Sequence, residues 1–334
     1  MIKKLLFILS ILFLFSSCAS DSTGEFPLWV SSDWKNSFPD SEYLSSRGIS
    51  SSAELSKTEA LSQIARYINT SVNSNLLTSV RSINKGGEID ESTLIQNDVA
   101  VSSQVSLFGV EFTEPYYFKS EKKWYCVAYI NRNKAWEQYV PKIEDAKNSF
   151  YGFYNEAQGE NEPIFVIGYY KKALEKGKDF LTALEYGRLI HPAKEKQYSS
   201  DRNLLARIPS LIESEKQQVN IAIKIEGDYN EIIKTSLEKA FKNAGFSVSQ
   251  KGIYSANVLV KHNSDGKEPL AVFPSIDLTI SGVEKRTVYS YKERISERTV
   301  AFSLESAQKK SYPKLASKIE DTLPRELKEF TESN

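Results

Sequence analysis

Cysteine and histidine are scarce in this chain of 334 residues, which contains two of each. A fold stabilised by many disulfides is therefore excluded. A zinc site needs three or four ligands at characteristic spacing, and neither His191 nor His262 belongs to such a pattern. Both histidines are interpreted as surface or helix-capping residues, and we expect no metal and no cofactor.

An excess of charge of one sign is also missing, because 43 basic residues balance 43 acidic ones. Nucleic-acid binding usually requires a basic face, so we expect no nucleic-acid partner. The sequence contains no Gly-x-Ser-x-Gly elbow, phosphate loop or dinucleotide fingerprint. Asp90 and Glu91 could serve acid/base chemistry, but carboxylates in a polar loop are usually solvated. We therefore expect a protein that is not an enzyme.

A long hydrophobic run is absent as well. The most apolar segment, residues 5–15, is interrupted only by Ser10 and follows Lys3 and Lys4. It is shorter than the roughly 20 residues that a membrane-spanning helix needs. A short positive region, an apolar run and then small residues are typical of a secretory signal peptide.

The end of this segment, "FSSC", resembles a bacterial lipobox, in which the cysteine is lipidated and becomes the mature N-terminus. Phe15 replaces the usual Leu, a relaxed form that occurs in spirochaetes, and Cys18 is the predicted lipidation site. The alternative is an ordinary signal peptide cut near "SSCAS", which leaves a free thiol. Ala19 is not the aspartate that retains some lipoproteins at the inner membrane. We therefore expect a palmitate-type lipid anchor in the cell envelope, at the outer membrane.

The composition, 40% hydrophobic and 26% charged, predicts packed globular structure. The predicted fold class is α+β, with two small domains, each an antiparallel or mixed sheet with helices packed on one face, joined by a helical connector. The predicted segments are a signal peptide (1–17), a tether (18–25), a first α+β domain (26–141), the connector (142–217) and a C-terminal α/β domain (218–334).

The first domain is expected to start at "FPLWV", and a helix is predicted from Ser52. Apolar residues spaced by three or four form its predicted buried face, namely Leu61, Ile64, Ala65, Ile68 and Val72. Alternation between Val99 and Leu107 predicts a strand, and "VEFTEPYYFKSEKKWYCVAYI" predicts a hairpin with its turn near "SEKK". Cys126, within this hairpin, is interpreted as a small core residue. Asn131 or Asn133 is expected to cap the next helix.

In the connector, the apolar spacing predicts two helices joined near "EKGKD", the first ending at Gly177. The C-terminal domain starts with a strand at "VNIAIKIEG". A helix follows that carries Ile233, Leu237 and Phe241 and ends at Gly245. Alternating strands then lead to a closing helix that is expected to start around Pro313.

Several positions of residues 26–140 resemble the LPP-twenty family of bacterial lipoproteins. They are Pro27, Trp29, Val30, Tyr43, Gly48, Ala60, Trp124, Tyr125, Val127 and Ala128. The arrangement is also similar to the N-terminal domain of a flagellar-assembly protein of the outer-membrane ring. The resemblance implies an outer-membrane lipoprotein with a non-enzymatic role in the envelope, and it carries no catalytic residues.

Aromatic residues concentrate in the first domain, and they either pack the sheet or line a groove. For the second alternative, the candidate binding residues are Trp29, Tyr43 and Trp124, with peptidoglycan or an envelope protein as partner. The charged stretch "EKRTVYSYKERISER" is interpreted as a solvated strand face. We expect a lipid-anchored scaffold or binding module that is linked to outer-membrane or flagellar assemblies. The alternative is a periplasmic hydrolase or carbohydrate-active enzyme, which would have convergent carboxylates in a deep cleft.

Overall fold

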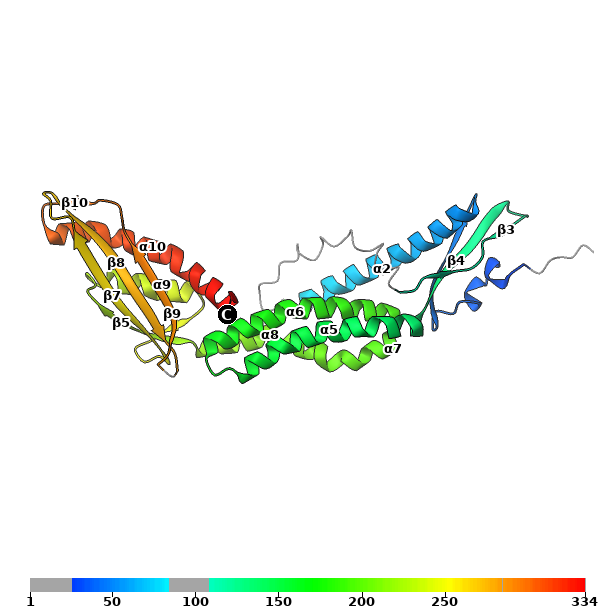
Figure 1. Cartoon of the computed structure of the whole chain (residues 1–334), viewed down its shortest axis with the longest axis horizontal. Helices are drawn as coiled ribbons and strands as arrows, with labels where there is room; N and C mark the ends of the chain where they lie inside the picture. The colour runs from blue at the N-terminus through cyan, green and yellow to red at the C-terminus, as the bar shows by residue number, and fades with distance from the viewer. Residues whose placement is uncertain (1–25, 84–107, 284, 334) are drawn as a thin grey trace, which may run out of the picture. The chain divides into compact units, whose positions relative to one another are not determined.

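The computed structural model describes residues 26–83, 108–283 and 285–333, whose helices and strands are drawn in Figure 1. The chain is α+β, as predicted. Contacts divide it into unit 1, Met1–Tyr67 with Ala100–Ala135, and unit 2, Ile68–Val99 with Trp136–Asn334. The five-segment domain organisation stays a prediction. The predictions on Cys18, on Asp90 and Glu91, and on a strand between Val99 and Leu107 lie outside the described residues.

Unit 1 contains a four-stranded antiparallel sheet in which one central strand pairs with all three others. Its strands are β1 (Tyr43–Ser50), β2 (Glu111–Phe112), β3 (Tyr116–Phe118) and β4 (Lys123–Asn131), and β4 pairs with each of the others. The hairpin predicted from the sequence is confirmed as β3 and β4, with residues 119–122 between them. Two short 3-10 turns, η1 (Leu28–Val30) and η2 (Trp34–Asn36), precede the sheet.

Helix α2 (Ala53–Ile83) confirms the helix predicted from Ser52, and the division between the units falls within it. Its buried residues recur every four positions, at Ser56, Ala60, Ile64, Ile68, Val72 and Leu76. The predicted face was partly wrong, because Leu61 is 37% exposed. A stripe with a spacing of four is narrower than the face expected from spacings of three and four, and Leu61 falls beside it.

Close packing joins α2 to β1 in unit 1. A Cβ atom added to Gly48 would lie 2.0 Å from the carbonyl oxygen of Ser56 and 2.6 Å from the amide nitrogen of Ala60. The helix backbone therefore lies directly on the strand at this glycine. Ser46, on the same face of β1, donates to Gln63 Oε1 at 2.6 Å.

Unit 2 begins with long helices. They are α5 (Arg132–Gly159, which starts in unit 1), α6 (Pro163–Ile190), the short α7 (Pro192–Glu195) and η5 (Lys196–Tyr198), and α8 (Ser199–Gln218). Asn131 caps α5, because its Oδ1 accepts from the amides of Asn133 and Lys134, each at 3.1 Å. The core between helices includes Phe150 of α5 and Phe180 of α6, whose rings stack 6.0 Å apart.

The prediction that a helix ends at Gly177 was wrong, since α6 continues through it to Ile190. Gly177 is buried where α6 packs on α8. An added Cβ there would lie 2.2 Å from Leu205 Cδ1. The glycine therefore serves close approach of two helices and not helix termination, a distinction that helical spacing alone does not make.

The C-terminal part of unit 2 is a six-stranded mixed sheet. Its elements are β5 (Asn220–Glu226), α9 (Ile232–Asn243), β6 (Ser247–Val248), β7 (Tyr254–Ser264), β8 (Leu270–Ser281), β9 (Thr287–Arg294), β10 (Val300–Ala301) and α10 (Leu304–Ser333). Strands β5 and β7 are parallel, whereas β7, β8 and β9 are antiparallel neighbours.

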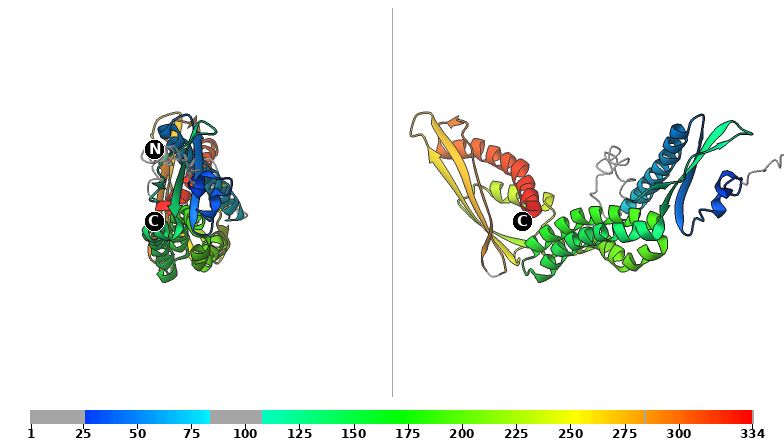
Figure 2. Two further views of the ribbon diagram at one scale, coloured as in Figure 1. Left: turned by 90° about the vertical axis from the view of Figure 1, so that its right-hand side faces the viewer. Right: turned by 45° about the vertical axis from the view of Figure 1, so that its right-hand side comes forward.

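Helices α9 and α10 cover one face of this sheet (Figure 2). Buried residues of the strands, such as Val258, Ile276 and Tyr291, face these helices, and Tyr291 Oη lies 2.6 Å from Thr322 Oγ1 of α10. Among the described residues, no helix covers the opposite face. That face is called the open face below.

The two helices test two sequence predictions. Gly245 follows α9 at a φ of +88°, and its amide donates to Lys242 O at 2.9 Å, so the predicted glycine end is confirmed. The predicted start of the last helix was wrong, because α10 begins at Leu304 and Pro313 lies inside it. Ser303 supplies the actual start, since its Oγ accepts from the amide of Ser306 at 3.2 Å.

Candidate binding surfaces

Trp29 lies in η1, beside the unit 1 sheet. Its ring contacts Tyr116 of β3 edge to face, with centroids 6.4 Å apart. Arg47 of β1 holds this turn in place, because its Nη1 donates to the carbonyl oxygens of Val30 at 3.0 Å and Ser31 at 2.6 Å. Trp29 is half-buried in this arrangement.

Arg47 joins the turn to the sheet. Its guanidinium lies 5.5 Å from the Trp34 ring centroid and 5.4 Å from that of Tyr125, within cation–π range. Burial lowers the pKa of Arg47, an effect that Tyr125 and Glu121 oppose. Because the guanidinium is used to hold the backbone and two rings, it supports the structure of unit 1 and is not available to a ligand.

Tyr43 belongs to a separate aromatic cluster at the other end of β1. Its ring lies 5.6 Å from that of Phe38 and 5.8 Å from that of Tyr129. Tyr129 donates to Glu111 Oε2 at 3.0 Å, and burial together with this bond raises the pKa of Tyr129. The cluster packs the end of the sheet where β1 begins.

Trp124 of β4 lies apart from both Trp29 and Tyr43. Its ring lies 5.3 Å from that of Tyr117, and it pairs with Ser50, at the opposite end of β1 from Tyr43. Side chains alternate along a strand, so Trp124 shares the face of Cys126, which is the face covered by α2, whereas Trp29 contacts the other face through Tyr116. The structure therefore does not bring Trp29, Tyr43 and Trp124 together, and their role in binding stays a prediction.

Cys126 and His191 have structural roles, whereas His262 lies on the surface. Cys126 is fully buried, as predicted, and burial raises the pKa of its thiol, against the opposing effect of a hydrogen bond from Thr113. His191 caps α7, with Nδ1 accepting from the Lys194 amide at 3.4 Å, and His262 is exposed on β7. Within the described ranges, no group of three His, Cys, Asp or Glu residues could hold a metal.

Helices long and apolar enough to cross a membrane are not found in the part of the chain that the structure describes.

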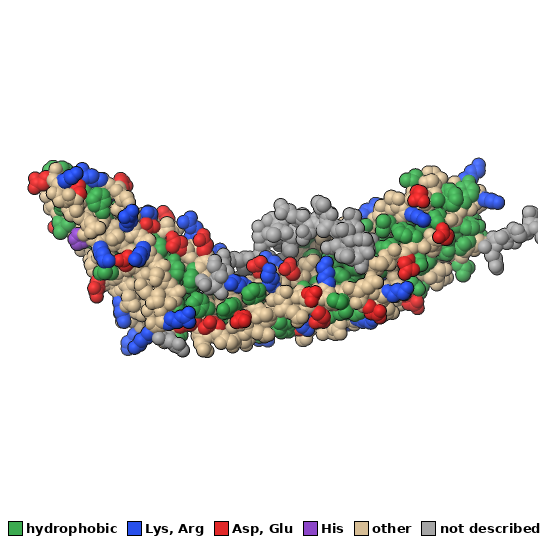
Figure 3. Space-filling model, viewed as in Figure 1, with side chains coloured by type: hydrophobic (Ala, Val, Ile, Leu, Met, Phe, Trp, Pro, Cys, Tyr) green, Lys and Arg blue, Asp and Glu red, His purple; other side chains and the backbone are tan. Residues whose placement is uncertain are grey.

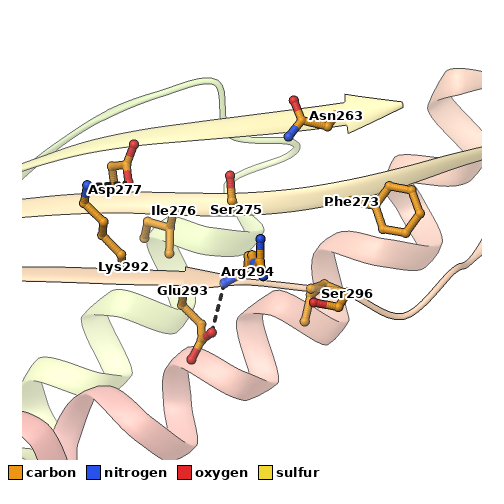
Figure 4. A pocket seen from close by; sticks show the side chains of 10 residues that line it. Asn263, Phe273, Ser275, Ile276, Asp277, Lys292, Glu293, Arg294 and Ser296 are labelled. Atoms are coloured by element: carbon orange, nitrogen blue, oxygen red, sulfur yellow. Dashed lines mark hydrogen bonds and ion pairs between the residues drawn. The ribbon is translucent and has the colours of Figure 1, made fainter. Parts of the chain in front are cut away.

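The open face of the C-terminal sheet carries a groove of about 660 Å³. Figure 4 shows its lining from β7, β8 and β9. The lining residues are Asn263, Phe273, Ser275, Ile276, Asp277, Lys292, Glu293, Arg294, Ile295 and Ser296. The groove is polar because the pairing of β8 with β9 sets polar residues side by side. Ser275 lies opposite Arg294, and Asp277 lies opposite Lys292. Paired residues share a face, so these four side chains belong to the open face.

Basic side chains outnumber acidic ones on this face. Lys261 donates to Asp277 Oδ2 at 2.7 Å, and Lys292 lies 3.9 Å from Asp277 Oδ1. The hydrogen bond from Lys261 is the main reason that the pKa of Asp277 is lowered, so the carboxylate stays charged. Within the described residues, the Arg294 guanidinium makes no hydrogen bond or ion pair. This part of the open face thus carries three cations and one carboxylate, and two of the cations contact it.

The second carboxylate of the groove points elsewhere. Glu293 lies on the helix-covered face, where it pairs with Lys318 of α10 at 2.9 Å. Figure 4 shows Glu293 directed toward α10 and Asp277 on the other side of the sheet. Asp277 and Glu293 therefore do not converge on a common point.

The sequence contained a signal for this groove. In "VYSYKER", the tyrosines at 289 and 291 alternate with Ser290, Lys292 and Arg294, so one face of the strand is apolar and the other basic. The stretch was interpreted as a solvated face because the sequence does not show which strands lie beside it. The neighbours β7 and β8 supply Lys261 and the single carboxylate, Asp277.

Comparison with known proteins gives no assignment by sequence, since neither a protein family nor a curated protein matches this chain. A minor lipoprotein from Acinetobacter baumannii is similar over 33% of this chain and 94% of its own, with 10% identity and a TM-score of 0.24. The secreted protein HP1454 from Helicobacter pylori is similar over 84% of this chain and 97% of its own, with 16% identity and a TM-score of 0.28. These TM-scores are too low for either structure to assign a fold or a function.

Proposed function

We propose that this chain is a lipid-anchored protein of the cell envelope, at the outer membrane, that acts as a binding module and not as an enzyme. Anchoring through Cys18 is supported by the order of charge, apolar run and small residues in front of it. The observation that carries the binding role is the groove on the open face, where Arg294 lies opposite Ser275 and Asp277 is held by Lys292 and the neighbouring Lys261.

The ligand best matched by the groove is a polymer that carries carboxylates. Arg294 has five donors in a planar fork that suits a carboxylate, and Ser275 beside it adds a hydroxyl. The groove is open and polar, as a site for an extended chain would be. Peptidoglycan, whose peptides bear carboxylates, is the envelope polymer with this chemistry, and we propose it as the partner.

The enzymatic alternative requires two carboxylates that flank one bond. Glycoside hydrolases place them about 5–10 Å apart and facing the same substrate. In this groove, Asp277 faces the open side and is bound to Lys261, whereas Glu293 is bound to Lys318 on the helix side. This arrangement supports binding over hydrolysis.

The anchoring proposal is tested by Cys18→Ala in the full chain. We expect the parent to fractionate with membranes and to carry acyl groups by mass spectrometry, and the variant to lose both. The proposal is contradicted if the parent carries no lipid, or if the variant is acylated and stays with membranes as the parent does.

The groove is tested separately by co-sedimentation with purified peptidoglycan, using the chain from residue 18 with Cys18→Ser. The double variant Lys292→Glu/Arg294→Glu should bind on the order of tenfold more weakly, because charge-assisted contacts are replaced by repulsion. The matched control is Lys242→Glu/Lys309→Glu, two exposed lysines on α9 and α10. Equal loss in both variants, or no binding by the parent, would count against a site in this groove.

A further inference from the structure

One end of unit 1 combines exposed apolar side chains with exposed lysines. We call it the hairpin-end surface. Its members are Phe26, Leu28, Leu55, Tyr117, Lys119, Lys122 and Lys123.

The pairing of the strands explains why these residues lie at the same end. The turn between β3 and β4 carries Lys119 and Lys122, and Lys123 begins β4. The turn follows Phe118, whose ring lies 5.4 Å from that of Phe26. On the other strand, Ser50 pairs with Trp124, one residue beyond Lys123. Helix α2 begins three residues after Ser50, so its first turn, with Leu55, lies at this end too.

The apolar members are large side chains with much of their area in solvent. Leu28 is 74% exposed, Leu55 53%, Phe26 43% and Tyr117 41%. A single exposed apolar residue is ordinary on a protein surface. Several at one end, next to basic residues, are typical of a surface that contacts a partner or a membrane. In Figure 3, hydrophobic side chains and Lys or Arg side chains lie together over the β3–β4 end of unit 1.

The β3–β4 turn of this surface carries an excess of positive charge. Lys119, Lys122 and Lys123 are exposed, and within the described residues none of them makes an ion pair. The acidic residue of the turn, Glu121, accepts a hydrogen bond from Tyr125 Oη, so its carboxylate is directed back to the sheet. Exposed lysines beside apolar and aromatic side chains match the headgroup and upper acyl layers of a bilayer that contains anionic lipid.

The position in the chain indicates which partner covers this surface. Residues 19–25 separate Cys18 from Phe26, and a fully extended chain spans at most about 28 Å over that interval. A lipid on Cys18 would therefore keep Phe26 and Leu28 within reach of the bilayer. We infer that the hairpin-end surface lies on the membrane and binds anionic phospholipid, an inference that rests on the proposed lipid anchoring.

The surface can be tested without the anchor. The chain from residue 18 with Cys18→Ser is floated with vesicles of phosphatidylcholine, with and without phosphatidylglycerol, at low and high salt. We expect binding to the anionic vesicles that weakens as salt rises. Lys119→Glu/Lys122→Glu/Lys123→Glu should weaken it on the order of 100-fold, since each lysine near an anionic surface contributes about a fivefold effect. Phe26→Ser/Leu28→Ser should weaken binding to the same anionic vesicles severalfold.

The matched control reverses three exposed lysines of unit 2, Lys242, Lys251 and Lys309. It should bind anionic vesicles like the parent, and circular dichroism should show every variant folded. The inference is overturned if the parent does not bind anionic vesicles. It is also overturned if the control loses as much binding as the triple variant of Lys119, Lys122 and Lys123. Acylation of Cys18 is measured independently. If the native chain is acylated but the Cys18→Ser chain does not bind vesicles, this inference is overturned and the proposed anchoring is not.

Discussion

Individual glycines decide how closely the elements of this protein approach each other. Gly48 allows the backbone of α2 to lie on β1, and Gly177 allows α6 to lie on α8. By contrast, Gly152 in α5 has no atom within 4 Å of the place where a Cβ would be. Replacing glycine by alanine should therefore lower stability at Gly48 and Gly177 and raise it slightly at Gly152.

Substitution Gly48→Ala should lower the free energy of unfolding of unit 1 by about 3 kcal/mol, the upper part of the range for overpacking. The reason is that the new methyl group meets backbone atoms of Ser56 and Ala60, which no rotamer change can move. Urea unfolding followed by tryptophan fluorescence measures this, because Trp29, Trp34 and Trp124 lie in unit 1 and Trp136 alone lies in unit 2.

The control is Gly152→Ala, which meets open space in an exposed helix position. It should leave the unit 1 transition unchanged and stabilise α5 by up to ~1 kcal/mol, the difference in helix propensity. If Gly48→Ala unfolds at the same urea concentration as the parent, α2 does not contact β1 as described.

Ionic contacts connect the helices of unit 2. Glu185 of α6 is fully buried, and Arg202 of α8 donates to its Oε1 at 2.7 Å and to Glu195 Oε1 at 2.6 Å. Burial alone would lower the pKa of Arg202, but the bonds to Glu195 and Glu185 outweigh it and raise the pKa. Arg188 pairs with the other oxygen of Glu185 at 2.8 Å.

Replacing Arg202 by Ala should lower the free energy of unfolding of unit 2 by roughly 3 kcal/mol, because two carboxylates with little access to water lose a charged partner. This is the lower part of the range for a broken buried pair, since Arg202 is itself 26% exposed. Thermal unfolding followed by helical circular dichroism measures the change.

Arg207 on the same helix provides the comparison, because it is exposed and, within the described residues, makes no ion pair. Arg207→Ala should change stability by less than about 0.5 kcal/mol. Equal effects of the two substitutions would mean that the Arg202 network contributes nothing specific.

Amphipathic spacing predicted α2 and α9, because each helix has one buried and one exposed face, and alternation predicted β5. Aromatic-rich runs on either side of a turn predicted the β3–β4 hairpin, although residues 125–128 of β4 are buried on both faces. The errors fall where a residue type has two uses. Gly177 was taken as a helix end, although it is a packing site, and Pro313 was taken as a helix start, although it lies inside α10. Local sequence does not contain the neighbour that decides between these uses.

At the scale of the whole molecule, the number of reactive thiols tests the predicted mature form. The chain has two cysteines, of which Cys126 is fully buried in unit 1. Lipidation would convert the Cys18 thiol to a thioether. The native mature protein should therefore show no thiol that reacts rapidly with Ellman's reagent, and one after unfolding.

The variant Cys126→Ala serves as the comparison. It should show no thiol that reacts with Ellman's reagent, whether native or unfolded. One fast thiol in the native parent would indicate an unmodified Cys18, as expected for an ordinary signal peptide cut near "SSCAS". The measurement thus separates the two interpretations of the N-terminus independently of membrane fractionation.

Local sequence was sufficient to predict the α+β class, the buried core position of Cys126, a helix cap at Asn131 or Asn133 and the helix end at Gly245, because propensity, periodicity and capping are local properties. The tertiary structure decided which surfaces could bind. It separated Trp29, Tyr43 and Trp124 along and across one sheet, and it gathered Lys261, Asp277, Lys292 and Arg294 from three strands on another. Both outcomes depend on strand register and on which face the helices cover, and those are set by contacts between residues far apart in the chain.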